Sequence, residues 1–175
     1  MEITFEAFAA DCVVRGTYEL GAERLSDQLN AAETVELRVA VLQSLEDGHI
    51  VALPQVAIPV GDLCAVVAAG PRGAADRRRH GRADLVEIRV GPYTVIGDLH
   101  SMIGSGPRDV HRRNVAFVAV TEARVLGPAG EDTAVTWPAT LLVNRSLIER
   151  VSDAGGAISA ALSIPGRDGP LGPAR

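Results

Sequence analysis

The feature that most constrains this chain is a short segment that occurs twice. Arg24–Asn30 reads as a short helix between two strand-like runs, and Asp98–Gly104 reads as its copy. In each copy two aliphatic side chains lie four residues apart and so share one face of a helix. A helix this short is not stable alone in water, so burial of that aliphatic face must hold it. The paired positions, each 74 residues apart, are Leu25 with Leu99, Leu29 with Ile103, and Asn30 with Gly104.

Two further correspondences extend this repeat along the chain. Gly16 precedes Tyr18 as Gly91 precedes Tyr93, at an offset of 75. Towards the C-terminal end the offset grows to 84, which a longer polar loop at Ser105–Asn114 would explain. This pattern predicts duplication of a module followed by loop growth in the second copy. The pairs at the larger offset are Pro54 with Pro138, Ile58 with Leu142, and Leu63 with Leu147.

Most of the remaining sequence reads as β-strand. Ile3–Leu20 is rich in β-branched and aromatic residues and predicts one long bent strand or two short ones. Thr34–Leu42 alternates apolar with charged residues, the period of two that marks a half-buried strand. Pro54 and Pro59 favour bends or a sheet edge, because proline cannot donate to a sheet ladder. Further strand-like runs are Ile50–Leu53, Val56–Val60, Leu63–Ala69, Val86–Val90 and Val115–Val125.

These patterns predict a mainly β fold with short helices (α+β), made of two related antiparallel β modules packed as a pseudo-symmetric pair. The first module is expected at residues 1–70 and the second at 84–153. An exposed Arg-rich linker is expected at 71–83, and a flexible C-terminal tail at 154–175. Hydrophobic residues make up 47% of the chain but aromatics only 3%, so Val, Leu, Ile and Ala must form the core.

Charge and lysine content restrict the chemistry of the chain. The formal net charge of −5 argues against a surface that coats nucleic acid or anionic membrane. All 17 basic residues are arginine. A lysine Schiff base, a phosphate-binding P-loop lysine and a lysine general base are therefore excluded. A GC-rich genome is the simplest explanation for the missing lysine.

The cysteines and the N-terminal segment bear on location. Cys12 and Cys64 lack the spacing of a redox motif or a zinc site and read as ordinary buried thiols in a reducing compartment. Met1–Glu6 is acidic where a secretory signal would be basic. Apolar runs such as Val56–Gly70 are interrupted too early to span a membrane. The sequence therefore predicts a cytoplasmic protein with no membrane span.

Several short motifs resemble those of a small, uncharacterised bacterial β-domain family. They are Gly16–Tyr18, the Arg-Leu-Ser-Asp-x-Leu-Asn element at Arg24–Asn30, the Thr-x-Ala-x-Val element at Thr121–Val125, and Asn144–Ile148, which is similar to the family's final strand. The first module lacks the Thr-x-Ala-x-Val part, and the second lacks the Arg, Ser, Asp and Asn of the helix element. The resemblance implies two diverged copies of one β-domain. It implies no activity.

The polar residues of the helix element are the first candidate site. Ser26 and Asn30 lie four residues apart and Asp27 and Asn30 three apart, so part of the set could line a cleft. Arg24 and Asp27 would then serve a small ligand or a reaction. The structural alternative is capping by Ser26 or Glu23, a helix stop at Asn30 and an ion pair to a strand. The second module lacks these residue types, which favours the structural interpretation.

A second candidate site combines His100, Asp109 and His111, with Asp98 as a fourth metal ligand. Their spacing matches no recognised metal motif. A triad of Ser101, His100 and Asp98 is disfavoured because neighbours in sequence rarely face one another, and no Gly-x-Ser-x-Gly elbow is present. The glycines do not form a dinucleotide-binding motif either. We therefore expect no cofactor and keep the three residues only as weak metal candidates.

The arginines form the third candidate site. If the linker and the Ser105–Asn114 loop lie together, their arginines would form a basic patch for phosphate, an acidic protein tail or RNA. The exposed aromatics that usually accompany RNA binding are absent, which favours a solvated linker. The partner-binding candidates are Arg77, Arg78, Arg79, Arg108, Arg112 and Arg113.

Taken together, the sequence predicts a non-catalytic interaction or scaffolding module with a protein partner. It lacks lysine, a phosphate loop, metal spacing and a catalytic carboxylate pair with histidine. One alternative is a ligand-binding protein or small enzyme that uses Arg24 with Asp27, or His100 with Asp109 and His111. A second alternative is binding of RNA or an acidic partner through the arginine loops. Nucleic acid is not the expected partner, and homo-oligomerisation is left open.

Overall fold

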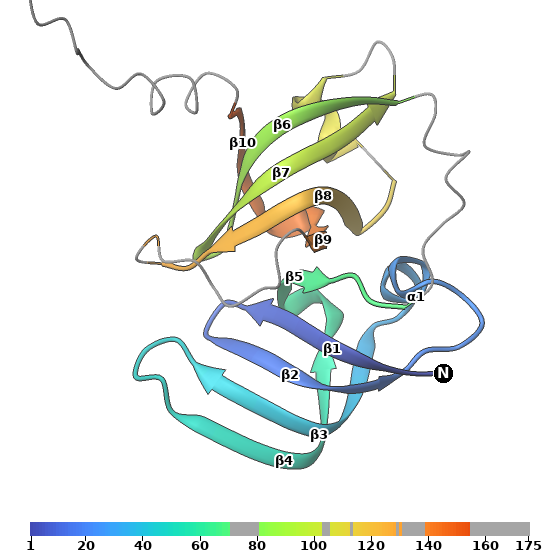
Figure 1. The fold of residues 1–175 in the computed structure, drawn as a ribbon, viewed down its shortest axis with the longest axis vertical. Helices are drawn as coiled ribbons and strands as arrows, with labels where there is room; N and C mark the ends of the chain where they lie inside the picture. Colours follow the sequence, from blue (N-terminus) through green and yellow to red (C-terminus); the bar gives the residue numbers. More distant parts are fainter. Residues whose placement is uncertain (71–80, 103–105, 113, 129, 131–138, 155–175) are drawn as a thin grey trace, which may run out of the picture.

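The fold is built almost entirely of β-strands. The computed structural model describes residues 1–70, 81–102, 106–112, 114–128, 130 and 139–154. Within these residues, ten antiparallel strands form one sheet (Figure 1), which confirms the predicted mainly β class. From edge to edge the strand order is β10-β6-β7-β8-β9-β5-β1-β2-β3-β4. In the part of the chain that is described, no helix is long and apolar enough to cross a membrane.

The first module folds as a meander whose last strand returns to the first. Alternation in Thr34–Ser44 buries Val35 and Leu37 and exposes Glu36, as predicted for a half-buried strand. The run predicted at Ile3–Leu20 is two strands. The elements are β1 (Glu2–Ala9), β2 (Cys12–Glu19), α1 (Leu25–Ala31), β3 (Thr34–Ser44), β4 (Ile50–Pro59), the 3₁₀ helix η1 (Val60–Asp62) and β5 (Leu63–Val67).

The second module follows the same path. Its strands hydrogen-bond in the order β10-β6-β7-β8-β9, as those of the first module do in the order β5-β1-β2-β3-β4. The predicted duplication stays a prediction, and this shared order supports it. The elements are β6 (Gly81–Val90), β7 (Tyr93–Met102), the 3₁₀ helix η3 (Pro107–Arg112), β8 (Phe117–Leu126), β9 (Ala139–Asn144), the 3₁₀ helix η4 (Arg145–Leu147) and β10 (Ile148–Asp153).

The prediction of a second short helix at Asp98–Gly104 is wrong. Residues up to Met102 belong to β7, which pairs with β6 on one side and β8 on the other. A spacing of four residues places two side chains on one face of a strand as well as of a helix, so the leucine pattern did not distinguish them. Leu25 and Leu99 also lie in different buried clusters. The 3₁₀ helix η3 lies within the predicted polar loop and takes the place of α1 in the second module.

The equivalent glycines are Gly16 and Gly97, at an offset of 81, and not Gly16 and Gly91. Each interrupts the pairing register between the second and third strands of its module. Opposite them, Val39 and Glu122 both have φ of 48°, which marks a β-bulge in each module. At the C-terminal end η1 and η4 begin 85 residues apart, one more than the predicted 84.

Two other expectations change in the second module. Asn144–Ile148, which resembles the family's final strand, contains the end of β9, all of η4 and only the first residue of β10. The predicted linker overlaps β6, because this strand begins at Gly81. Residues 71–80 of that linker lie outside the described residues, as do residues 155–175 of the predicted tail. Ala154 is described, and its backbone N–H donates to the carbonyl of Leu85 at 3.0 Å.

The two modules meet where β5 and β9 pair edge to edge. All residues that pair there are apolar, as expected for strands that are covered on both faces. Beside this joint, the Asn144 side-chain amide donates to the carbonyls of Val60 and Gly61 at 3.5 and 3.4 Å. The paired residues of the two strands are Ala65 with Val143, Val66 with Leu142, and Val67 with Leu141.

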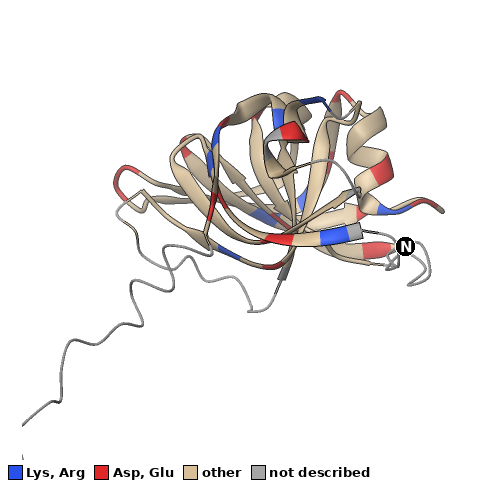
Figure 2. Cartoon of the chain, turned by 90° about the horizontal axis from the view of Figure 1, so that it is seen from above, with Lys and Arg blue, Asp and Glu red and all other residues tan. Residues whose placement is uncertain are grey.

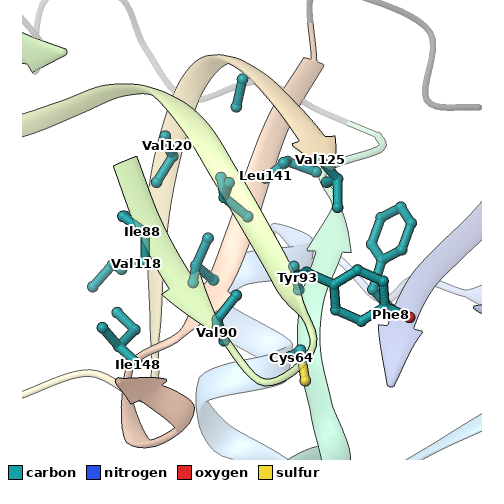
Figure 3. Close-up of a cluster of buried hydrophobic side chains, with 14 of the residues drawn as sticks. Phe8, Cys64, Ile88, Val90, Tyr93, Val118, Val120, Val125, Leu141 and Ile148 are labelled. Atoms are coloured by element: carbon teal, nitrogen blue, oxygen red, sulfur yellow. The ribbon is translucent and has the colours of Figure 1, made fainter. Parts of the chain in front are cut away.

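Each of two buried clusters takes side chains from both modules. The cluster of the second module contains Phe8, Val13, Cys64 and Ala65 from the first. Figure 3 shows Phe8 beside Tyr93, with ring centroids 5.4 Å apart and the rings nearly perpendicular. The cluster of the first module likewise contains the second-module residues Phe117 and Leu142. The described strands therefore share their cores across the joint.

Candidate interaction surface

The helix α1 is fixed by the two leucines that the sequence singled out. Leu25 and Leu29 are buried and pack in the cluster of the first module. A further tether comes from Tyr18, whose hydroxyl donates to the side-chain oxygen of Gln28 at 3.0 Å. The prediction that two aliphatic side chains hold this helix is confirmed.

The polar residues of α1 have structural contacts that differ from those expected. Arg24 occupies the N-cap position without a side-chain cap hydrogen bond, so capping by Ser26 or Glu23 is wrong. The helix continues through Asn30 to Ala31, so Asn30 is not a helix stop. Its side chain instead accepts from the N–H of Phe117 at 2.8 Å and donates to the carbonyl of Ser26 at 2.7 Å.

Asn30 therefore links α1 to the second module, whereas Arg24 and Asp27 have no comparable contact. Among the described residues, neither Arg24 nor Asp27 takes part in an ion pair. Asp27 is exposed and Arg24 is partly buried. The predicted ion pair to a strand is thus wrong for the described part of the chain, and the cluster does not assemble a charged site.

We expect Asn30→Ala to lower the free energy of unfolding by about 1–2 kcal/mol, because it removes the acceptor of the Phe117 N–H. Ser26→Ala is the matched control. Its side chain makes no cap hydrogen bond, and alanine raises helix propensity in both variants. Urea unfolding of the two variants measures the difference. Equal midpoints would contradict a stabilising link between α1 and β8.

The structure does not bring the candidate metal ligands together. His100 lies within β7, and its Nε2 is 2.7 Å from the hydroxyl of Thr121. Asp109 lies in η3, where it accepts from the N–H of Gly106 at 2.9 Å. His111 is exposed at the end of the same 3₁₀ helix. Among the described residues, no group of three His, Cys, Asp or Glu side chains could hold a metal ion.

The arginine candidates are only partly described. Arg77, Arg78, Arg79 and Arg113 lie outside the described residues. Arg108 and Arg112 lie in η3, and Arg112 forms an ion pair with Asp109 at 3.3 Å.

Figure 2 shows acidic and basic positions next to one another on several strands and turns. Ion pairs such as Arg15 with Glu6, at 2.8 Å, account for some of these neighbours. Among the described residues, five arginines form such an ion pair.

The two cysteines are unpaired and lie near Tyr93. Cys64 is buried against the β6–β7 turn, where a Cβ on Gly91 would lie 2.8 Å from its sulfur. Cys12 is only partly buried, and its carbonyl accepts from the Tyr93 hydroxyl at 3.5 Å. Burial raises the pKa of both thiols to about 11. Burial raises the pKa of the Tyr93 hydroxyl as well, so all three groups are neutral at pH 7.

We expect native Cys64 to react with iodoacetamide at pH 8 about a hundredfold more slowly than in unfolded chain, because its thiolate is scarce. Since the folded pKa is raised, the thiol's contribution to stability is complete below pH 9 and is lost as the pH rises through about 11. Mass spectrometry of timed alkylation, with and without denaturant, measures the rate. Rapid native labelling would contradict this burial.

The free edge of β4 is the most distinctive exposed feature. In the described sheet β4 pairs with β3 alone, along nearly its whole length. This edge position confirms the prediction made from Pro54 and Pro59. Every second residue of an edge strand directs its backbone N–H and C=O groups away from the sheet. In Figure 1 this strand lies at the bottom of the view, beside β3.

The side chains of this edge are uncharged and mostly exposed, whereas Ile58 is buried. No charged residue occurs from Ile50 to Pro59. Ile50 and Val51 are 58% and 41% exposed, and Val39 on the adjoining β3 is 74% exposed. Natural proteins usually protect such an edge with charged side chains. Together, the edge of β4 and these three side chains define what we call the β4 surface.

The opposite edge of the sheet is protected in the usual way. It is formed by β10, which pairs with β6 alone among the described strands. This strand carries Glu149, Arg150 and Asp153, all exposed. Glu149 forms an ion pair with Arg89 of β6 at 3.2 Å. Among the described strands, β4 is therefore the edge that carries no charged side chain.

The sequence contains a signal for the β4 surface that belongs to none of the motifs described above. Ile50–Pro59 is a strand-like run without charge, and its prolines place it at an edge. The two observations together indicate an edge that lacks charged side chains and is protected by its prolines alone. A resemblance to a bacterial β-domain family stays a prediction. The chain matches no family model, no curated protein and no solved structure.

Proposed function

We propose that this chain is a non-catalytic interaction module that binds a protein partner through the β4 surface. The observation that carries the proposal is the free edge of β4, which has no charged side chain and exposes Ile50 and Val51. A partner strand would pair with the backbone groups of the edge and cover these side chains. Strand addition of this kind is a recurring mode of peptide recognition.

The rest of the described surface favours this function over the alternatives. The polar side chains of α1 do not converge on a ligand, and His100, Asp109 and His111 do not converge on a metal. Residues 1–70 contain eleven acidic residues and three arginines, an unfavourable balance for RNA. Two unpaired thiols suit a reducing compartment, so we place the module in the cytoplasm.

The proposal is tested by placing a charge on the edge. Ala52 is exposed on β4, and Ala52→Lys should reduce recovery of the partner because the joint would bury an unpaired charge. Ala119→Lys is the matched control, since it puts the same charge on an exposed alanine of β8, inside the sheet. Recovery from the native cell extract and the melting temperature are measured for both. Equal recovery with both variants would exclude the β4 surface.

A third variant separates this proposal from binding through the arginines. Replacement of Arg77, Arg78 and Arg79 by alanine should leave recovery unchanged if β4 is the binding surface. Loss of recovery with this variant, together with full recovery for Ala52→Lys, would favour an acidic partner or RNA instead. In that case binding would also fall steeply with salt.

A further inference from the structure

We infer that the partner at the β4 surface is a second copy of this chain, joined by antiparallel pairing of β4 with β4 about a two-fold axis. This inference rests on the proposed function and names the partner. Two-fold dimers are the commonest symmetric assemblies, and a two-fold axis perpendicular to a sheet relates two edge strands in antiparallel fashion. The product is one sheet that runs through both copies.

The strand of the second module that corresponds to β4 is β9, and it already pairs through this edge. β4 and β9 occupy the same position in their modules, directly before the 3₁₀ helices η1 and η4. In the second module, that edge is covered because β9 pairs with β5 of the first module. In the first module, the corresponding edge of β4 pairs with no other described strand. Edge pairing at this position is therefore an interface that the fold demonstrably forms.

The absence of charge in β4 favours a two-fold joint. Because Ile50–Pro59 carries no charge, two copies of β4 can lie antiparallel without placing like charges opposite each other. A head-to-tail joint of β4 with β10 of another copy is the competing arrangement. In the internal joint, the corresponding positions are those of Cys64 and Ala65, and these two residues are buried. The head-to-tail joint would bring Glu149 and Arg150 to such positions. Burying the Glu149–Arg89 ion pair together with the charge of Arg150 is costly, so the two-fold arrangement is favoured.

The two prolines of β4 limit where along the strand the contact can form. Pro54 and Pro59 each remove one backbone donor, so a paired stretch lies between the β3–β4 turn and Pro54 or between the two prolines. The large apolar side chains that β4 exposes, Ile50 and Val51, belong to the first of these stretches. Pairing there places apolar side chains of the second copy beside them. We therefore assign the contact to Ile50–Leu53.

Sedimentation velocity of the full chain over a wide range of concentration tests this inference. We expect the unaltered chain and Ala119→Lys to form a monomer–dimer equilibrium. Ala52→Lys should weaken dimerisation about tenfold or more, because each dimer then holds two lysines in one joint. Circular dichroism and melting temperature of the two variants establish that both are folded.

Every other outcome counts against the inferred dimer. An unaltered chain that stays monomeric, a dimer that Ala52→Lys does not weaken, or growth beyond the dimer would each overturn the inference. If the chain is monomeric but Ala52→Lys still loses a partner that Ala119→Lys retains, the second copy is wrong and the proposed function stands. If it is monomeric and both variants retain the partner, both proposals fail.

Discussion

Gly97→Ala is expected to lower the free energy of unfolding by about 3 kcal/mol and the melting temperature by about 6–12 °C. The reason is the close approach of β7 to the bulge of β8. A Cβ on Gly97 would lie 2.8 Å from the Cα and Cβ of Ala123 and from the carbonyl oxygen of Thr121. Two of these atoms are backbone, so they cannot move away without breaking the bulge. Thermal and urea unfolding measure the loss.

Gly16→Ala in the first module is the matched control. Its nearest contacts are looser, with the carbonyl oxygen of Arg38 at 3.1 Å, the Cβ of Leu37 at 3.3 Å and the Cα of Ala40 at 3.4 Å. Alanine also restricts the unfolded chain, which offsets part of any strain. We expect a change within about 1 kcal/mol. A Gly97→Ala variant as stable as Gly16→Ala would show that the two strands are further apart than described.

Phe8→Ala is expected to destabilise the chain by about 3–5 kcal/mol, because it empties a fully buried site. Although Phe8 belongs to β1 of the first module, it packs in the cluster of the second, against Tyr93. The variant should therefore unfold in a single transition at a lower temperature, with both modules affected together. Calorimetry tests this through equality of the calorimetric and van't Hoff enthalpies.

Phe5→Ala provides the comparison within the first module. Phe5 is equally buried but packs in the cluster of the first module, beside Tyr18 with ring centroids 5.7 Å apart. Its loss should be similar in size and should also give one transition. Two separate transitions in the Phe8→Ala variant, with the second module unchanged, would contradict cores that are shared across the β5–β9 joint.

Local patterns in the sequence predicted the strands well. Alternation identified β3, and the prolines favoured a bend or a sheet edge at β4, which the strand order shows to be an edge. Both signals act within a few residues, through the side-chain period and the missing N–H of proline. The same kind of signal was ambiguous at Leu99, because a spacing of four fits one face of a helix or of a strand.

Contacts between distant segments could not be predicted in this way. The runs around Val66 and Leu142 are apolar on both faces, which indicates burial but not the neighbouring strand. Asn30 was expected to end the helix. Its contact with the second module could not be predicted, because the backbone N–H that it binds, that of Phe117, lies 87 residues away in the sequence. For the candidate site, the absence of charge in Ile50–Pro59 was visible in the sequence. Its meaning depended on the strand order of the whole sheet.

The most direct test of the account is hydrogen exchange of the β4 amides, measured by mass spectrometry in dilute and in concentrated chain. We predict that the amides of Ile50–Leu53 that face away from β3 exchange fast in the dilute sample and slowly in the concentrated one. In the Ala52→Lys variant their exchange should stay fast at both concentrations, while β6 and β7 exchange equally in all samples. Unchanged exchange in β4, with slowing at η3 or at β10 instead, would contradict an interaction surface on this edge.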